Sequence, residues 1–134
     1  MSVGLVVVSH SAKVAEGVVE MAAQMAEGVR IQAAGGADDG GIGTDANLIA
    51  EAIAAADEGD GVLVLADLGS AVLSAQLAID EFVDEELRGR VRIAEAPVVE
   101  GAVVAAIQAA TGSSLDEVEQ TAKGAATMVK VKDS

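Results

Sequence analysis

The stretch VGLVVVSH, residues 3–10, joins a continuous apolar run to a serine and to His10, the only histidine of the chain. An apolar run without alternating polar residues is typical of a strand that is buried on both faces of a parallel sheet. The run GVLVLAD, residues 61–67, has the same character and ends in Asp67. These two runs predict the centre of a parallel sheet, with polar side chains where each strand ends.

The segments around these runs predict alternating helices and strands. Helices are expected over residues 12–28, 46–57, 71–87, 97–110 and 115–125, and two further strands over 29–34 and 91–96. Thr44 or Asp45 and Ser70 suit N-caps, Pro97 suits a first turn, and Ser114 with Glu117 forms a capping-box pattern. The order predicts an α/β fold, an open and mainly parallel sheet of about four strands with helices on both faces. The tail MVKVKDS, residues 128–134, is expected to add a short fifth strand or to be disordered.

Length and composition limit the number of domains, the kinds of partner and the location that are expected for this protein. The 134 residues suit a single domain, 1–134, with one substantial core. A net charge of −14 and a single aromatic residue, Phe82, argue against nucleic acid and anionic membranes as partners. The acidic surface suits a partner with a basic docking face, or simply keeps an alanine-rich protein in solution. The chain has no cysteine, no secretory signal pattern and no long uncharged apolar run, so a cytoplasmic location is expected.

The candidate site lies where the predicted strands end. In open α/β sheets, ligands bind at the carboxyl ends of strands, near the point where the strand order reverses. The first strand leads to a serine and the histidine, the second to a glycine-rich loop, and the third to Asp67 and a helix start. The residues expected at this edge are Ser9, His10, Gly43, Thr44, Asp67, Gly69 and Ser70.

The histidine and the aspartate suit covalent catalysis. An imidazole is a good nucleophile near neutral pH, and a carboxylate on its other nitrogen fixes the tautomer. We therefore expect His10 to be the nucleophile that takes a phosphoryl or acyl group. Asp67 is expected to orient the ring and to stabilise the imidazolium that forms. Hydroxyl groups and helix N-termini favour anions, so the candidate phosphate-binding residues are Ser9, Gly43, Thr44, Gly69 and Ser70.

Other interpretations of these residues are weaker but remain open. His10 could be a packing histidine, and Thr44 and Ser70 could be ordinary N-caps. A hydrolase triad is disfavoured because GxSxG is absent and Ser9 should point away from His10 along an extended strand. No nucleotide-binding fingerprint appears. One histidine and no cysteine argue against a metal cluster, the pair Asp38–Asp39 is weak evidence for a cation site, and no cofactor is expected.

The chain resembles the enzyme IIA domains of the mannose-type phosphotransferase system over essentially its whole length. The resemblance rests on the motifs VVVSHS, a glycine loop that reaches GT, and GVLVLADLGSA. The family implies that His10 carries a phosphoryl group received from phospho-HPr, and that the protein is a homodimer. The transporter branch has a pattern like DLFGGSP, whereas DLGSA resembles the branch that serves dihydroxyacetone kinase.

The two branches imply different acceptors for the phosphoryl group. In the kinase branch the acceptor is ADP held by the subunit DhaL, and the ATP formed phosphorylates dihydroxyacetone on the subunit DhaK. In the transporter branch it is a histidine of a IIB domain. A non-catalytic regulatory module with a structural His10 is the third interpretation.

Overall fold

The structure is a computed structural model that describes residues 1–132. Four strands form one parallel sheet in the order β2-β1-β3-β4. The strands are β1 (Gly4–Ser9), β2 (Ile31–Gly35), β3 (Val62–Ala66) and β4 (Val91–Ile93). The helices are α1 (Ala12–Met25), α2 (Ala46–Ala56), α3 (Gly69–Glu81), α4 (Glu85–Arg88), α5 (Val98–Ala110) and α6 (Leu115–Gly124), followed by the 3-10 turn η1 (Ala125–Thr127). The expected α/β fold with a parallel sheet is confirmed.

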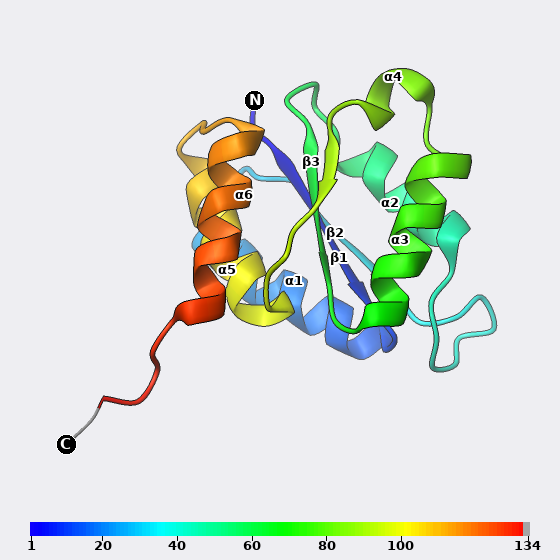
Figure 1. Ribbon diagram of the computed structural model, residues 1–134, viewed down its shortest axis with the longest axis horizontal. Coiled ribbons are helices and arrows are strands. Elements are labelled where there is room, and N and C mark those ends of the chain that lie inside the picture. Colours follow the sequence, from blue (N-terminus) through cyan, green and yellow to red (C-terminus); the bar gives the residue numbers. More distant parts are fainter. Residues whose placement is uncertain (133–134) are drawn as a thin grey trace.

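Helices cover both faces of the sheet (Figure 1). Helices α1, α5 and α6 pack on one face, where Leu5 and Val7 of β1 point, and α2, α3 and α4 pack on the other, where Val6 and Val8 point. All six residues of β1 are buried as a result. The unbroken apolar run of this strand therefore follows from its place at the centre of a two-sided core.

Glycine permits close contacts between β1 and α2 and between β2 and α1. A Cβ atom on Gly4 would lie 2.0 Å from the carbonyl oxygen of Ala56, at the end of α2. One on Gly35 would lie 2.6 Å from the carbonyl oxygen of Ser11, the N-cap of α1. Strand interiors with glycine often mark such close backbone approaches. The contact at Gly35 fixes the start of α1 against the carboxyl edge of the sheet.

Several element boundaries differ from the sequence expectation. The helix expected over 71–87 is two helices, because the chain leaves helical geometry at Phe82 and resumes only at Glu85. The strand expected over 91–96 ends at Ile93. Residues 128–132 form no strand, and Lys130 pairs with Glu100 of α5 instead. The last two residues of the tail lie outside the described residues. No helix within residues 1–132 is long and apolar enough to cross a membrane.

The buried face of α1 is also rotated from the one that the larger side chains indicate. Val14, Val18, Met21 and Met25 recur at helical spacing, yet only Val18 is buried and the other three are exposed. The buried positions are Ala15, Val18 and Ala22. Small side chains let the helix lie close to the sheet, so packing distance determines which face is buried.

Candidate active site

His10 and Asp67 meet at the carboxyl edge because their strands are neighbours in the sheet. β1 pairs with β3 in the register Val8 to Ala66, and the Asp67 amide donates to the Val8 carbonyl oxygen at 3.1 Å. The chain runs outward from β1 to β2 on one side and from β3 to β4 on the other. The strand order therefore reverses between β1 and β3, which is where ligands bind in folds of this kind.

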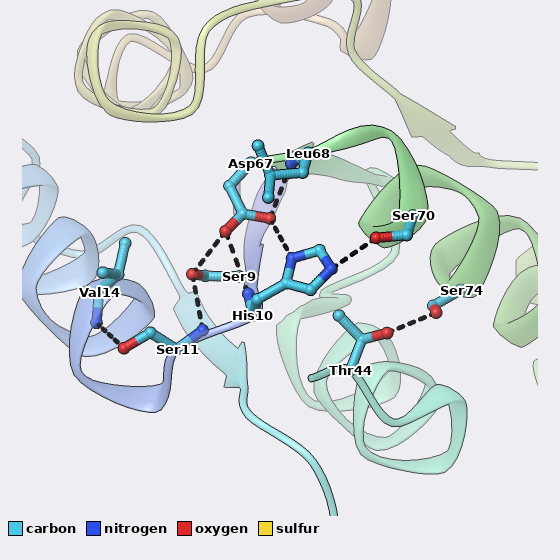
Figure 2. Close-up of polar contacts among 9 residues, drawn as sticks. All are labelled: Ser9, His10, Ser11, Val14, Thr44, Asp67, Leu68, Ser70 and Ser74. Atoms are coloured by element: carbon cyan, nitrogen blue, oxygen red, sulfur yellow. Dashed lines mark hydrogen bonds and ion pairs between the residues drawn. The ribbon is translucent and has the colours of Figure 1, made fainter. Parts of the chain in front are cut away.

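The Asp67 carboxylate is surrounded by hydrogen-bond donors (Figure 2). Its Oδ1 lies 2.9 Å from Nδ1 of His10 and accepts from the Leu68 amide at 2.7 Å. Its Oδ2 accepts from the Ser9 hydroxyl at 2.8 Å and from the His10 amide at 3.0 Å. A carboxylate accepts only, so Nδ1 of the neutral ring carries the proton and Nε2 keeps the lone pair.

The same contacts keep Asp67 ionised. Burial alone would raise the pKa of this carboxyl group, but the hydrogen bonds from the backbone and side chain of His10, the Ser9 hydroxyl and the Leu68 amide outweigh it and lower the pKa below its ordinary value. Asp67 is therefore an anion near neutral pH. It is placed to stabilise positive charge on the ring if Nε2 forms a bond.

The other ring nitrogen contacts helix α3. Nε2 of His10 lies 2.6 Å from Oγ of Ser70. The interpretation of Ser70 as an N-cap is wrong: Leu68 occupies that position without a side-chain bond, and Ser70 lies in the first turn. Its hydroxyl is turned to the imidazole. Within residues 1–132, the amides of Gly69 and Ser70 have no acceptor, so both are available to a ligand at this helix N-terminus.

The remaining predicted phosphate-binding residues have their polar groups engaged within the protein. The Gly43 amide donates to the carbonyl oxygen of His10 at 2.9 Å, and the Thr44 hydroxyl lies 2.5 Å from the hydroxyl of Ser74. Of the two N-cap candidates for α2, the structure selects Asp45, whose carboxylate accepts from the amides of Asn47 and Leu48. Gly43 and Thr44 thus hold the glycine-rich loop in place beside the histidine.

Ser9 departs most from its expected orientation. Its side chain was expected to point away from His10, but the chain bends at His10, and both side chains reach Asp67. Ser9 is fully buried, and its hydroxyl also accepts from the Ser11 amide at 3.1 Å. This hydroxyl orders the carboxylate and the start of α1 rather than facing outward.

Sequence reasoning missed Ser74. It lies in the middle of α3, where a serine carries no local signal of function. The only available signal was its spacing of one helical turn from Ser70, which places both hydroxyl groups on one face of the helix.

The region offers little to a metal ion. Within residues 1–132, no three His, Cys, Asp or Glu side chains come together as a metal site would require. Asp38 and Asp39 lie in the exposed loop, and the Asp39 carboxylate accepts from the Gly41 amide at 2.8 Å.

The arrangement instead favours an anion bound to the ring. The side chains of His10 and Asp67 are 20% and 18% exposed, so a ligand can reach the imidazole while the carboxylate beside it is held by its hydrogen bonds. Helices α1, α2 and α3 all begin at this edge of the sheet (Figure 1). The positive ends of their dipoles favour negative charge there. An imidazole that accepts a phosphoryl group fits this setting.

Comparison with known proteins points in the same direction. The family model described as "PTS system fructose IIA component" matches residues 4–119. The chain is 45% identical over 120 residues to the phosphoryl donor subunit DhaM of the PEP-dependent dihydroxyacetone kinase of Escherichia coli K12, covering 87% of this chain and 25% of that protein. It is 40% identical over 119 residues to the subunit of the same name of dihydroxyacetone kinase 2 of Listeria innocua, covering 88% and 94%.

The relatives differ in length. The chain spans about a quarter of the curated relatives from Klebsiella michiganensis and Escherichia coli (28% and 25%) and nearly all of the one from Listeria innocua. A crystal structure described as a protein of unknown function superimposes with a TM-score of 0.83 at 37% identity, covering 92% of this chain and 95% of that one. A sigma-54 interaction domain protein from Enterococcus faecalis shares the fold, with a TM-score of 0.67 at 16% identity.

Proposed function

Because this chain belongs to the EIIA-man family, described as the PTS system fructose IIA component, we propose that it is a phosphoryl carrier whose carrier residue is His10. The family resemblance read from the motifs is confirmed by these matches. One observation supports the proposal above the others: Asp67 holds Nδ1 at 2.9 Å, which leaves the Nε2 lone pair beside the Ser70 hydroxyl at a helix N-terminus.

The donor that we propose is phosphohistidine on HPr. The Nε2 lone pair of His10 attacks the phosphorus atom, and the N–P bond of the donor breaks as the new N–P bond forms. The electron pair of the broken bond returns to the donor imidazole. Asp67 stabilises the imidazolium of His10 during this step. The Ser70 hydroxyl turns from Nε2 to a phosphoryl oxygen, and the amides of Gly69 and Ser70 bind the same group.

The acceptor that we propose is ADP held by the subunit DhaL, which would regain ATP for phosphorylation of dihydroxyacetone on the subunit DhaK. An oxygen of the ADP β-phosphate attacks phosphorus, the N–P bond breaks, and Nε2 recovers its lone pair. Support comes from the relatives, which are named as phosphoryl donor subunits of dihydroxyacetone kinase. The net charge of −14 would speed encounter with a basic docking face. We propose a cytoplasmic location, which these proposed partners would require.

The proposal includes a homodimer, as the family resemblance implies. Helix α3 leaves Leu73 and Leu77 exposed, and Phe82 follows them at the end of the helix with half of its surface exposed. A second copy would bury such side chains. Sedimentation or light scattering at several concentrations checks this part, and a monomer at every concentration would contradict it.

A second candidate is a IIA domain that phosphorylates a histidine of a IIB transporter domain. The description of the matching family, a fructose IIA component, favours it. The two candidates share the chemistry at His10 and differ only in the acceptor.

The decisive experiment combines the protein with phosphoenolpyruvate, enzyme I and HPr, with His10→Ala as the control. We expect one acid-labile phosphate by intact mass on the wild type and none on the variant, whose circular dichroism should be unchanged because the side chain lies at the edge of the core. ADP-loaded DhaL and a IIB domain are then offered separately to the phosphorylated protein. Phosphate on His10→Ala, or none on the wild type in the presence of charged HPr, would contradict the carrier role.

A further inference from the structure

We infer that the hydroxyl pair of Thr44 and Ser74 positions His10 for reaction by fastening the glycine-rich loop to helix α3. The inference deepens the proposed function and rests on it for its kinetic consequence. Neither residue contacts the imidazole among the hydrogen bonds of the described residues. Both are therefore positioning residues, which act on the ring through the groups next to them.

The loop between β2 and α2 needs such a fastening. It contains Gly36, Gly40 and Gly43, all with positive φ, and its backbone therefore has large conformational freedom to lose. Two of its backbone hydrogen bonds are internal, from the Ala37 amide to Gly41 and from the Gly40 amide to Ala37, both 2.9 Å, and two tie it to the end of β1, from the Gly36 amide to Ser9 and from the Gly43 amide to His10. Within residues 1–132, the contact of Thr44 with Ser74 is the only side-chain hydrogen bond that joins this loop to α3.

The hydrogen bond between Thr44 and Ser74, called the bridge below, completes a closed circuit of contacts that includes His10; Figure 2 shows its two side-chain contacts, Thr44 with Ser74 and Ser70 with His10. The carbonyl oxygen of His10 accepts from the Gly43 amide at 2.9 Å, and Thr44 is the next residue along the chain. Thr44 bonds to Ser74 at 2.5 Å, Ser70 lies one turn earlier on the same helix, and Ser70 returns to Nε2 of His10 at 2.6 Å. The backbone and the ring of His10 are thus both tied to α3, by two routes that meet on one helix face.

Apart from His10 itself, no residue of this circuit contacts Asp67 among the hydrogen bonds of the described residues. The carboxylate accepts from Ser9, His10 and Leu68, and none of these groups belongs to the loop. Asp67 sets which nitrogen carries the proton. The bridge between Thr44 and Ser74 determines the position of Nε2 of His10 relative to the Ser70 hydroxyl. Opening the bridge should therefore loosen the Ser70 contact while leaving the tautomer unchanged.

Two readouts should move in opposite directions when the bridge is opened. A small electrophile reaches Nε2 whenever the Ser70 hydroxyl moves away, so its reaction becomes faster. Transfer from a docked protein requires the nitrogen at one place and orientation, so it becomes slower. Partial unfolding would also expose the imidazole, so urea unfolding of each variant must give the stability of the wild type for the split to count.

The test uses diethyl pyrocarbonate, which carbethoxylates imidazole, and the single histidine of the chain makes the absorbance change specific to His10. We expect Thr44→Val to raise this rate about fivefold, as loss of one hydrogen bond would. We expect it to lower kcat for phosphorylation by phospho-HPr about tenfold with KM unchanged. Thr44→Ser keeps the hydroxyl and should restore both rates. Long-range ¹H–¹⁵N spectra of the ring should report the same tautomer throughout.

The matched control is Thr121→Val, which removes a hydroxyl that donates to Gln108 at 3.2 Å between α6 and α5, and both rates should stay at the wild-type value. Ser74→Ala should match Thr44→Val, and the double variant should equal either single variant, because one contact is lost in each case. Additive effects, or a Thr44→Val protein that reacts like the control, would overturn the inference. If the wild type takes no phosphate while the carbethoxylation rates follow this pattern, the proposed function fails and the positioning role stands.

Discussion

Two aspartates at opposite ends of the sheet have a lowered pKa, and they reach it by different means. Asp57, at the C-terminus of α2, meets the guanidinium of Arg90 through bonds of 2.7 and 3.2 Å, and this partner is the main reason that its pKa is low. Among residues 1–132, no guanidinium or ammonium group contacts Asp67. Burial raises its pKa, and neutral N–H and O–H donors bring it down below the ordinary value.

This difference in hydrogen-bond donors distinguishes Asp57, whose role is structural, from Asp67, whose charge is available to a reaction. The charge of Asp57 is already balanced by Arg90, so this pair can only tie the end of α2 to the residue before β4. The charge of Asp67 is stabilised by dipoles but not balanced. It can therefore stabilise a cation that forms only during a reaction, such as a phosphorylated imidazolium. A depressed pKa alone does not distinguish the two sites, whereas the nature of the donors does.

The largest effect should come from Asp67→Asn, with Asp57→Asn as its matched control. Asp67→Asn can donate to Nδ1, which moves the ring proton to Nε2 and removes the nucleophilic lone pair. We expect phosphorylation of His10 to slow on the order of 100-fold. Asp57→Asn should leave the rate within about twofold of the wild type, since its partner lies at the other end of the sheet. Quench-flow measurement with phospho-HPr checks both, and equal losses in the two variants would end the comparison.

A smaller effect is expected from Ser9→Ala, which removes one donor from the Asp67 carboxylate. The variant should phosphorylate about fivefold more slowly, because the loss of a single hydrogen bond raises the pKa of Asp67 and loosens its hold on the ring. Ser113→Ala is the control, since it removes a hydroxyl that accepts from Gln108 at 2.6 Å far from the site. An unchanged rate in Ser9→Ala would show that the remaining donors suffice.

The smallest effect concerns acid stability. Both carboxyl groups have a folded-state pKa below the ordinary 3.8, so their contribution to stability is present above that pH and is lost as the pH falls through the folded-state pKa. Asp57→Asn and Asp67→Asn should each flatten the loss of stability below about pH 4. High salt should weaken the contribution of Asp57, which depends on a full charge, more than that of Asp67. Urea unfolding across this pH range, with and without salt, measures both effects.

The sheet and its carboxyl edge were accessible from the sequence because their signals are local. The unbroken apolar runs before Ser9 and Asp67 predicted buried parallel strands, and parallel strands bring their carboxyl ends together whatever the details of packing. Ser114 and Glu117 predicted the start of α6 correctly, since a capping box needs only a spacing of three residues.

The errors arose where tertiary contacts override local signals. Ser70 is a residue type that is favoured at N-caps, but helix α3 starts earlier. The Ser70 hydroxyl instead contacts the imidazole of His10, 60 residues away in the chain. Val14, Val18 and Met21 recur at helical spacing, yet of these only Val18 belongs to the buried face of α1, which it shares with two alanines. Ser74 was missed because nothing in its neighbourhood reveals that a loop residue 30 positions earlier contacts it.

The burial of β1 has a consequence for how a carrier of this design would work. Its backbone is paired on both sides and its side chains are enclosed by both cores, so the strand that supports His10 is among the last parts of the protein to move. If His10 is the carrier residue, it is attached to a rigid strand and cannot move between two binding sites. Donor and acceptor must then bind at the same site in succession, and neither can bind while the other is still bound. The turnover of such a carrier would then depend on how quickly each partner protein dissociates.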